Sequence, residues 1–246
     1  MSSATPYIRC VGLHKGFRGK PVLRGLSLDV LAGETLVILG GSGSGKSVLL
    51  KHMNALLRPD AGTVAVDGVA LETLDEDALT TVRRNVAMLF QQGALFDSLT
   101  VAENVAYGLR EHELVPPEGI DEPVRRALGM VGLEGTERLM PAELSGGMRK
   151  RAALARALVL EPRALLYDEP TTGLDPVVAA KINHLIRDLQ GRLKITSVVV
   201  THDLGSAFFV ADRIAFLHEG RIRFIGTPDE ARADHDPALR EFLTAA

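Results

Sequence analysis

Short, mostly apolar runs alternate along this chain with longer segments whose apolar residues have helical spacing. The apolar runs are rich in Val, Ile and Leu, end at turn residues and are too short for helices, which predicts buried strands. These strands are expected at residues 35–39, 86–90, 164–167 and 195–200. Strands that alternate with helices favour an α/β fold, in which helices cover both faces of a mainly parallel sheet.

Both ends of the chain carry shorter β signals. Further strands, separated by turn residues such as those at 17–21, are expected at residues 8–11, 26–30 and 63–66. Near the other end, residues 214–225 form two apolar runs around His218-Glu219-Gly220, a pattern typical of a hairpin. A short tail of helices is expected at residues 227–246.

Residues 95–160 have helical texture instead. Thr100 with Glu103 three residues later is the pattern of a helix N-cap box. Residues 122–131 are amphipathic, and residues 149–160 are rich in Ala, Leu and Arg. We therefore expect one domain with a helical insertion. Its α/β core would comprise residues 1–94 and 161–246.

Composition narrows the class of protein. A chain of 246 residues with 46% hydrophobic and 24% charged residues is typical of a soluble globular domain. Its net charge of −3 gives no electrostatic reason to expect nucleic acid as a partner. Cys10 is the only cysteine, which suits a reducing cytoplasm. The N-terminal residues show no export signal, and no apolar run reaches the roughly 18 residues that cross a bilayer, so a membrane role would require a partner.

A glycine-rich loop follows the expected strand at 35–39 and precedes a helical pattern. It fits the phosphate-binding pattern G-x-x-x-x-G-K-[ST] and consists of Gly40, Gly41, Ser42, Gly43, Ser44, Gly45, Lys46 and Ser47. Its backbone N–H groups and the helix N-terminus suit phosphate, Lys46 suits the outer phosphates, and the Ser47 hydroxyl suits Mg²⁺. The alternative is an ordinary Gly/Ser-rich turn.

Two acids follow the expected strand at 164–167. Ligands gather at the carboxyl ends of strands in open α/β sheets, so Asp168 is expected near the glycine loop, where it would hold Mg²⁺ with Ser47. Glu169 is the candidate to orient or deprotonate the attacking water, because adjacent acids on an extended backbone point in different directions. The alternative is a pair of helix-capping acids.

Two further polar residues also stand at strand ends. His202 follows the strand at 195–200 and could donate to a terminal phosphate oxygen. Gln91 closes the strand at 86–90 and could ligate Mg²⁺ through its amide oxygen, although Gln92 competes for this role.

Taken together, these motifs resemble the ABC-type ATPases over nearly the whole chain. The matching segments are the signature loop at 144–148, Gln91 as the Q-loop, 167–169 as the Walker B end, 173–175 as the D-loop, His202 as the switch histidine, and Phe17 as an aromatic that stacks on adenine. The resemblance implies ATP and Mg²⁺ as cofactors. It also implies a P-loop NTPase (RecA-like) core with an N-terminal antiparallel β subdomain and a helical signature subdomain.

The family's mechanism implies a head-to-tail dimer of two copies. Ser145, Gly146 and Gly147 of one chain would cap the γ-phosphate held by Lys46 of the other. The helix that Ser145 opens has unsatisfied N–H groups that suit an anion, although an ordinary capped helix start would look similar. The resemblance also places Val48 and Asp175 at the nucleotide site. Two residues depart from the pattern: Met148 replaces the common Gln, and Phe17 replaces the common Tyr.

A narrower resemblance is to the ATPases of bacterial Mla/MCE lipid transporters. It is carried by residues 90–96, 144–148, 151–157 and 236–243. It implies a subunit on the cytoplasmic face of the inner membrane that drives (phospho)lipid transport through an MlaE-like permease, with an MCE protein handling the lipid. The permease would contact residues 91–99 and the helical insertion. Two alternatives stay open: the ATPase of a small-solute importer and a non-transport ABC ATPase.

Overall fold

The computed structural model describes residues 5–245; residues 1–4, where we predict no export signal, and residue 246 lie outside this range. A six-stranded sheet has the strand order β10-β9-β3-β8-β7-β6. Its strands are β3 (Thr35–Leu39), β6 (Val86–Leu89), β7 (Ala164–Asp168), β8 (Thr196–Thr201), β9 (Arg213–His218) and β10 (Arg221–Gly226). All pairs are parallel except β9 with β10, which form the expected hairpin. The mainly parallel sheet is therefore confirmed.

Alternate residues of the central strands enter two separate hydrophobic clusters, because successive side chains of a strand point to opposite faces. Val37 and Leu39 pack with five helices: α3 (Val101–Glu111), α4 (Asp121–Met130), α5 (Gly146–Leu158), α6 (Pro176–Leu193) and α7 (Leu204–Val210). Leu36 and Ile38 pack with α1 (Lys46–Met53) and a second sheet. Both faces of the six-stranded sheet are covered, as predicted. One face packs against helices, and the other packs against α1 and the second β-sheet.

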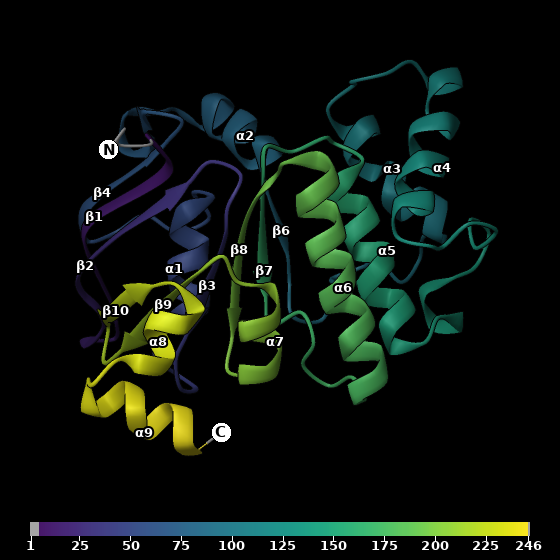
Figure 1. The fold of residues 1–246 in the computed structure, drawn as a ribbon. Helices are drawn as coiled ribbons and strands as arrows, with labels where there is room; N and C mark the ends of the chain where they lie inside the picture. Colours follow the sequence, from purple (N-terminus) through teal and green to yellow (C-terminus); the bar gives the residue numbers. More distant parts are fainter. Residues whose placement is uncertain (1–4, 246) are drawn as a thin grey trace.

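The second sheet is four-stranded and antiparallel, in the order β2-β1-β4-β5. Its strands are β1 (Pro6–Phe17), β2 (Lys20–Leu31), β4 (Ala61–Val66) and β5 (Val69–Ala70). It lies on the opposite side of the molecule from α3 and α4 (Figure 1). Phe17 ends β1, so it belongs to a strand and not to the predicted turn at 17–21.

A run of helices joins β6 to β7. It contains α3 (Val101–Glu111), α4 (Asp121–Met130) and α5 (Gly146–Leu158), with short 3₁₀ turns at Pro117–Gly119 and Pro141–Glu143. The predicted capping box is present, with Thr100 and Glu103 bonded to each other's backbone. Ser145 is the N-cap of α5 and accepts from the N–H of Met148, so the helix begins where the signature-loop pattern predicted and includes most of the Ala-, Leu- and Arg-rich run at 149–160.

Two helices were not predicted: α2 (Glu76–Asn85), which follows a 3₁₀ turn at Leu71–Thr73, and α7 (Leu204–Val210). Asp75 caps α2, and its apolar side is short: Leu79 is buried and Val82 is partly buried against the hydrophobic cluster that the second sheet shares. The remaining helices are α6 (Pro176–Leu193), α8 (Pro228–Ala233) and α9 (Pro237–Ala245). The last two match the expected helical tail, and Phe242 packs against Phe216 of β9, with ring centroids 5.3 Å apart.

Candidate functional site

Three neighbouring parallel strands end at the same edge of the six-stranded sheet. β3 leads into the glycine loop, β7 ends at Asp168, and β8 leads to His202. In register, Leu39 lies beside Thr201, and Asp168 lies beside Val200. The topology therefore gathers the sequence-predicted phosphate, metal and water-directing groups in one place.

The glycine loop folds back over its own lysine. Lys46 is only 7% exposed, and its Nζ donates to the carbonyls of Gly40 at 2.7 Å and Gly41 at 3.1 Å. A side chain at Gly40 would lie 2.4 Å from the Leu217 carbonyl oxygen, so this turn accepts only glycine. Burial lowers the pKa of Lys46, and the charge of Glu169 opposes that shift. The site thus holds a cation that has lost much of its hydration.

The start of α1 suits a phosphate. Gly45, its N-cap, has φ 106° and supplies no side-chain cap, so the first N–H groups of the helix are not used by a capping side chain. The hydroxyl of Ser44 is buried without a partner in the described structure. Free backbone donors, an orphaned hydroxyl and a buried ammonium are the groups that a polyphosphate would satisfy.

Ser47 and Asp168 form the candidate metal pair. The Ser47 hydroxyl donates to Oδ1 of Asp168 at 2.7 Å, and Asp168 is 7% exposed. A hydroxyl and a carboxylate at this distance are the oxygen ligands that Mg²⁺ takes beside a bound polyphosphate. Among residues 5–245 no cluster of three or more His, Cys, Asp or Glu could hold a metal ion, so this pair would need phosphate oxygens and water to complete the shell.

Glu169 lies at the centre of the site, but its backbone is not extended as we predicted. It has φ 49°, in the left-handed region, and its N–H donates to the carbonyl of Val200. That turn, and not strand alternation, directs its carboxylate away from Asp168. The Glu169 oxygens lie 3.0 Å from Nδ1 of His202 and 3.6 Å from Nζ of Lys46.

Two threonines that the sequence analysis missed hold the same carboxylate. The hydroxyls of Thr172 and Thr201 donate to Oε2 of Glu169 at 3.1 and 3.3 Å. The signal was available for Thr201, since it directly precedes His202 at the end of β8.

Gln91 is held through its backbone carbonyl beside α5. Among the hydrogen bonds of residues 5–245, none joins its side chain to Ser47 or Asp168. Gln91 is exposed, and its carbonyl accepts from Lys150 of α5, a contact that the sequence did not reveal.

The predicted signature loop and D-loop meet around a separate cavity of about 340 Å³. Its lining includes Gln91, Gly146 and Gly173. Gly147 lies close to α6, because a side chain there would approach Val178 to 2.5 Å. Asp175 is the N-cap of α6 and accepts from Val177 and Val178 at 3.0 Å, so this acid is already used structurally.

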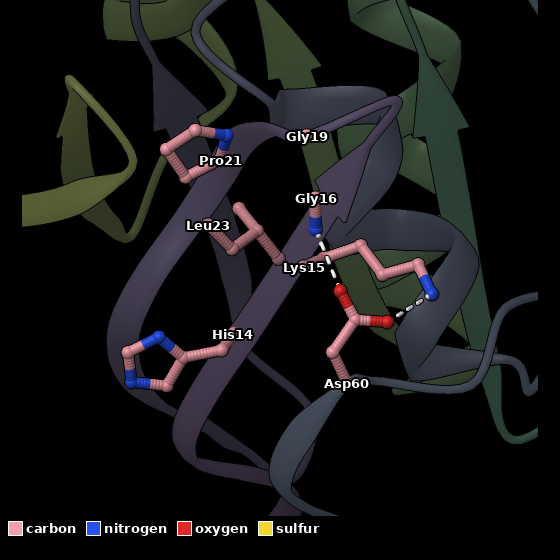
Figure 2. A pocket seen from close by; sticks show the side chains of 7 residues that line it. All are labelled: His14, Lys15, Gly16, Gly19, Pro21, Leu23 and Asp60. Atoms are coloured by element: carbon pink, nitrogen blue, oxygen red, sulfur yellow. Dashed lines mark hydrogen bonds and ion pairs between the residues drawn. The ribbon is translucent and has the colours of Figure 1, made fainter.

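Phe17 stands at the tip of the β1–β2 hairpin, 44% exposed, with Nζ of Lys15 5.7 Å from its ring centroid. A cavity of about 490 Å³ lies at the base of this tip (Figure 2). There, Asp60 accepts from Lys15 and from the N–H of Gly16, both at 2.7 Å. Asp60 and Lys15, which the sequence analysis did not select, therefore anchor the hairpin that carries Phe17.

A parallel sheet whose strand ends carry a glycine loop, a lysine and paired acids defines the class: a P-loop nucleoside triphosphatase. Comparison with known proteins narrows it. The family model for ABC transporters matches residues 23–172. The chain belongs to this family and is an ABC-type ATPase.

Individual relatives cover most of the chain. The probable ribonucleotide transport ATP-binding protein mkl of Mycobacterium leprae is 41% identical over 236 residues, which is 96% of this chain and 68% of that protein. The intermembrane phospholipid transport system ATP-binding protein MlaF of Escherichia coli is 42% identical over 218 residues, which is 89% of this chain and 81% of that protein.

Among solved structures, the dimeric ATP-binding cassette MJ0796 in a post-hydrolysis state, bound to ADP and Pi, is similar with a TM-score of 0.82 and 33% identity. The match covers 90% of this chain and 98% of that one. Within residues 5–245 of our protein, no helix has both the length and the apolar character to cross a membrane.

Proposed function

We propose that this chain is the ATP-hydrolysing subunit of a bacterial ABC transporter that moves phospholipid or another hydrophobic substrate. The observation that carries the ATPase site is the cluster of Lys46, Glu169 and His202 beside the Ser47–Asp168 pair. The substrate class rests on the 42% identity with MlaF, whose name specifies intermembrane phospholipid transport.

In the proposed site, backbone N–H groups of residues 40–48 and the ammonium of Lys46 bind the phosphates of ATP. Ser47 and Asp168 would hold Mg²⁺, which would neutralise charge on the outer phosphates. The amide oxygen of Gln91, an exposed side chain beside α5, would be a further ligand. When Lys46 pairs with the γ-phosphate of ATP, it no longer pairs with Glu169. The Glu169 carboxylate then keeps its hydrogen bonds with His202, Thr172 and Thr201.

Glu169 then accepts a hydrogen bond from the attacking water and orients it. His202 donates to the γ-phosphate, and its contact with Glu169 sets the direction of its ring. The exposed ring of Phe17 stacks on adenine.

We propose that two copies pack head to tail and share their sites. Ser145, Gly146 and Gly147 of one copy cap the γ-phosphate in the other, with Asp175 at the edge of the interface. Support comes from the N-terminus of α5, whose N–H groups suit an anion, and from the similar cassette MJ0796, which is dimeric.

The proposed partners are an MlaE-like permease and an MCE protein. The chain would bind at the cytoplasmic face of the inner membrane and contact the permease through residues 91–99 and the helical segment. We propose that residues 95–160 act as a helical unit on a core formed by residues 1–94 and 161–246, with residues 227–246 as its tail.

The name of the mkl relative supports a second candidate, a ribonucleotide importer with the same ATPase chemistry. Purification of the complex from membranes and mass spectrometry of its bound small molecules distinguish the two. Co-purified phospholipid with an MlaE-like permease supports lipid transport. Co-purified ribonucleotide with a different permease contradicts it. A soluble or nucleic-acid partner without any permease contradicts both.

A further inference from the structure

A continuous line of hydrogen bonds leaves Glu169 in the direction of α6. The hydroxyl of Thr201 donates to Glu169 and accepts from the backbone N–H of Asp203 at 3.1 Å. The side chain of Asp203 in turn accepts from the hydroxyl of Ser206. Ser206 accepts from Nδ2 of Asn183 on α6 at 2.7 Å.

Three residues of this line are buried, whereas Asp203, which connects Thr201 to Ser206, is exposed. Thr201 is 1% exposed, Ser206 is 3% exposed and Asn183 is 8% exposed. Thr171, at the start of the loop that leads to Asp175, lies 3.5 Å from the same Ser206 hydroxyl. The bonds at the two ends of the line, from Thr201 to Glu169 and from Asn183 to Ser206, are buried. Buried hydrogen bonds are stronger than exposed ones and costly to break, so these two bonds restrict the relative positions of the elements that they join.

The line joins α6, which follows the D-loop, to the start of α7, which follows His202. The proposed reaction must coordinate these two segments. Asn183 lies on α6, whose N-cap is Asp175 of the D-loop. Ser206 and Asp203 belong to the start of α7, directly after His202. A displacement of the D-loop by a second copy would therefore reach both His202 and the carboxylate of Glu169.

We propose that Asn183 and Ser206 are positioning residues for hydrolysis, which hold Glu169 and His202 in register with the D-loop end of α6. This inference rests on the proposed function of the site. Neither residue belongs to the nucleotide-binding groups, so their loss should affect turnover and leave ATP affinity intact.

Replacing Ser206 with Ala removes the hydroxyl that serves both neighbours in the line. Helix α7 keeps its cap, because Asp203 still accepts from the N–H groups of Gly205 and residue 206. A cavity of about 300 Å³ beside Asn183 and Ser206 leaves room for the added methyl group in Ser206→Thr. The serine position therefore offers both a deletion and a conservative rescue.

The test measures steady-state ATPase kinetics of the full chain, with melting temperature as a control for folding. We expect Ser206→Ala to lower kcat by about tenfold to a hundredfold, with KM for ATP changed by less than about twofold. Ser206→Thr should restore most of kcat. Asn183→Ala should lower kcat likewise, and the double variant should be no slower than the slower single variant, because both disrupt one line.

The matched control is Gln190→Ala, on the same helix. Gln190 bonds to the carbonyl of Gly33 and takes no part in the line to Glu169, so its loss should leave kcat unchanged. Wild-type kcat in Ser206→Ala, or an equal loss in Gln190→Ala, overturns the inference. Additive losses in the double variant overturn it too. A wild-type chain that hydrolyses no ATP contradicts the proposed function instead.

Discussion

Lys46 and Glu169 form an ion pair at the centre of the candidate site, with Nζ of the lysine 3.6 Å from Oε1 of the glutamate. Both residues are buried, at 7% and 8% exposure. Each charge is therefore the counterion of the other. An unpaired charge is costly to bury, so each residue needs a new partner when the ion pair separates. A γ-phosphate does this, since it offers Lys46 a stronger partner and leaves Glu169 free to accept from water.

Removing the lysine tests whether Lys46 binds the phosphates of ATP. In Lys46→Ala we expect ATP affinity to fall by about tenfold to a hundredfold, because a charge-assisted contact to phosphate is lost. Isothermal titration calorimetry measures this directly. Lys181→Ala, an exposed lysine on α6, is the control and should bind ATP as the wild type does. Unchanged affinity in Lys46→Ala would remove this residue from the phosphate site.

Glu169→Gln separates binding from hydrolysis. The amide keeps the shape of the side chain but is a poor base, so we expect kcat to fall by about a hundredfold or more while ATP still binds. An ATP-bound dimer of this variant should then accumulate, and size-exclusion chromatography would detect it. Glu161 has a similar left-handed backbone, with φ 52°, but it lies at the surface, paired with Arg126. Glu161→Gln should therefore keep wild-type turnover, and full turnover in Glu169→Gln would exclude Glu169 as the water-directing group.

The strand-end cluster could be predicted from sequence because each of its members follows a short apolar run. A parallel sheet aligns the ends of such runs, so order along the chain was enough to bring Ser47 to Asp168 and His202 to Glu169. The orientation of Glu169 could not be predicted in the same way. Its left-handed backbone depends on the N–H bond to Val200, a contact between strands that no local pattern records.

Contacts between residues far apart in the chain could not be predicted from the sequence either. Lys150 reaches the carbonyl of Gln91, and Asp60 reaches Lys15, across 59 and 45 positions respectively. Helix α2 was missed for a different reason. Its apolar face is limited to Leu79 and the partly buried Val82, so only a short apolar pattern marked it in the sequence.

Asp60 is expected to govern recognition of the base. In Asp60→Asn the anchor of the Phe17 hairpin weakens, so KM for ATP should rise about threefold to tenfold while kcat stays the same. Affinity for tripolyphosphate, which has no base to stack, should not change. Asp29→Asn removes a comparable exposed ion pair with Arg9 on the same hairpin and serves as the control. An equal loss of tripolyphosphate binding would show that Asp60 supports the whole site and not Phe17.

The pKa of Asp60 sets the pH range of this effect. The hydrogen bonds from Lys15 and Gly16 lower that pKa below its ordinary value of 3.8. A carboxylate with a lowered pKa in the folded state contributes its stabilisation above the ordinary value and loses it as pH falls through the lowered one. KM for ATP in the wild type should therefore not vary through Asp60 between about pH 6 and 8, which steady-state assays across that range can check.

Complementation between two inactive variants tests whether the site is shared. Ser145→Asp keeps an N-cap acceptor for α5 but places a negative charge where the γ-phosphate of the other copy would lie. Its ATPase rate should fall at least about tenfold with nucleotide affinity of the single chain unchanged. Mixed with Lys46→Ala, it should regain activity, because one site of the mixed dimer combines an intact Lys46 with an intact Ser145. No recovery, or a wild-type rate that is strictly linear in enzyme concentration at dilutions where single chains predominate, would mean that each copy hydrolyses ATP alone.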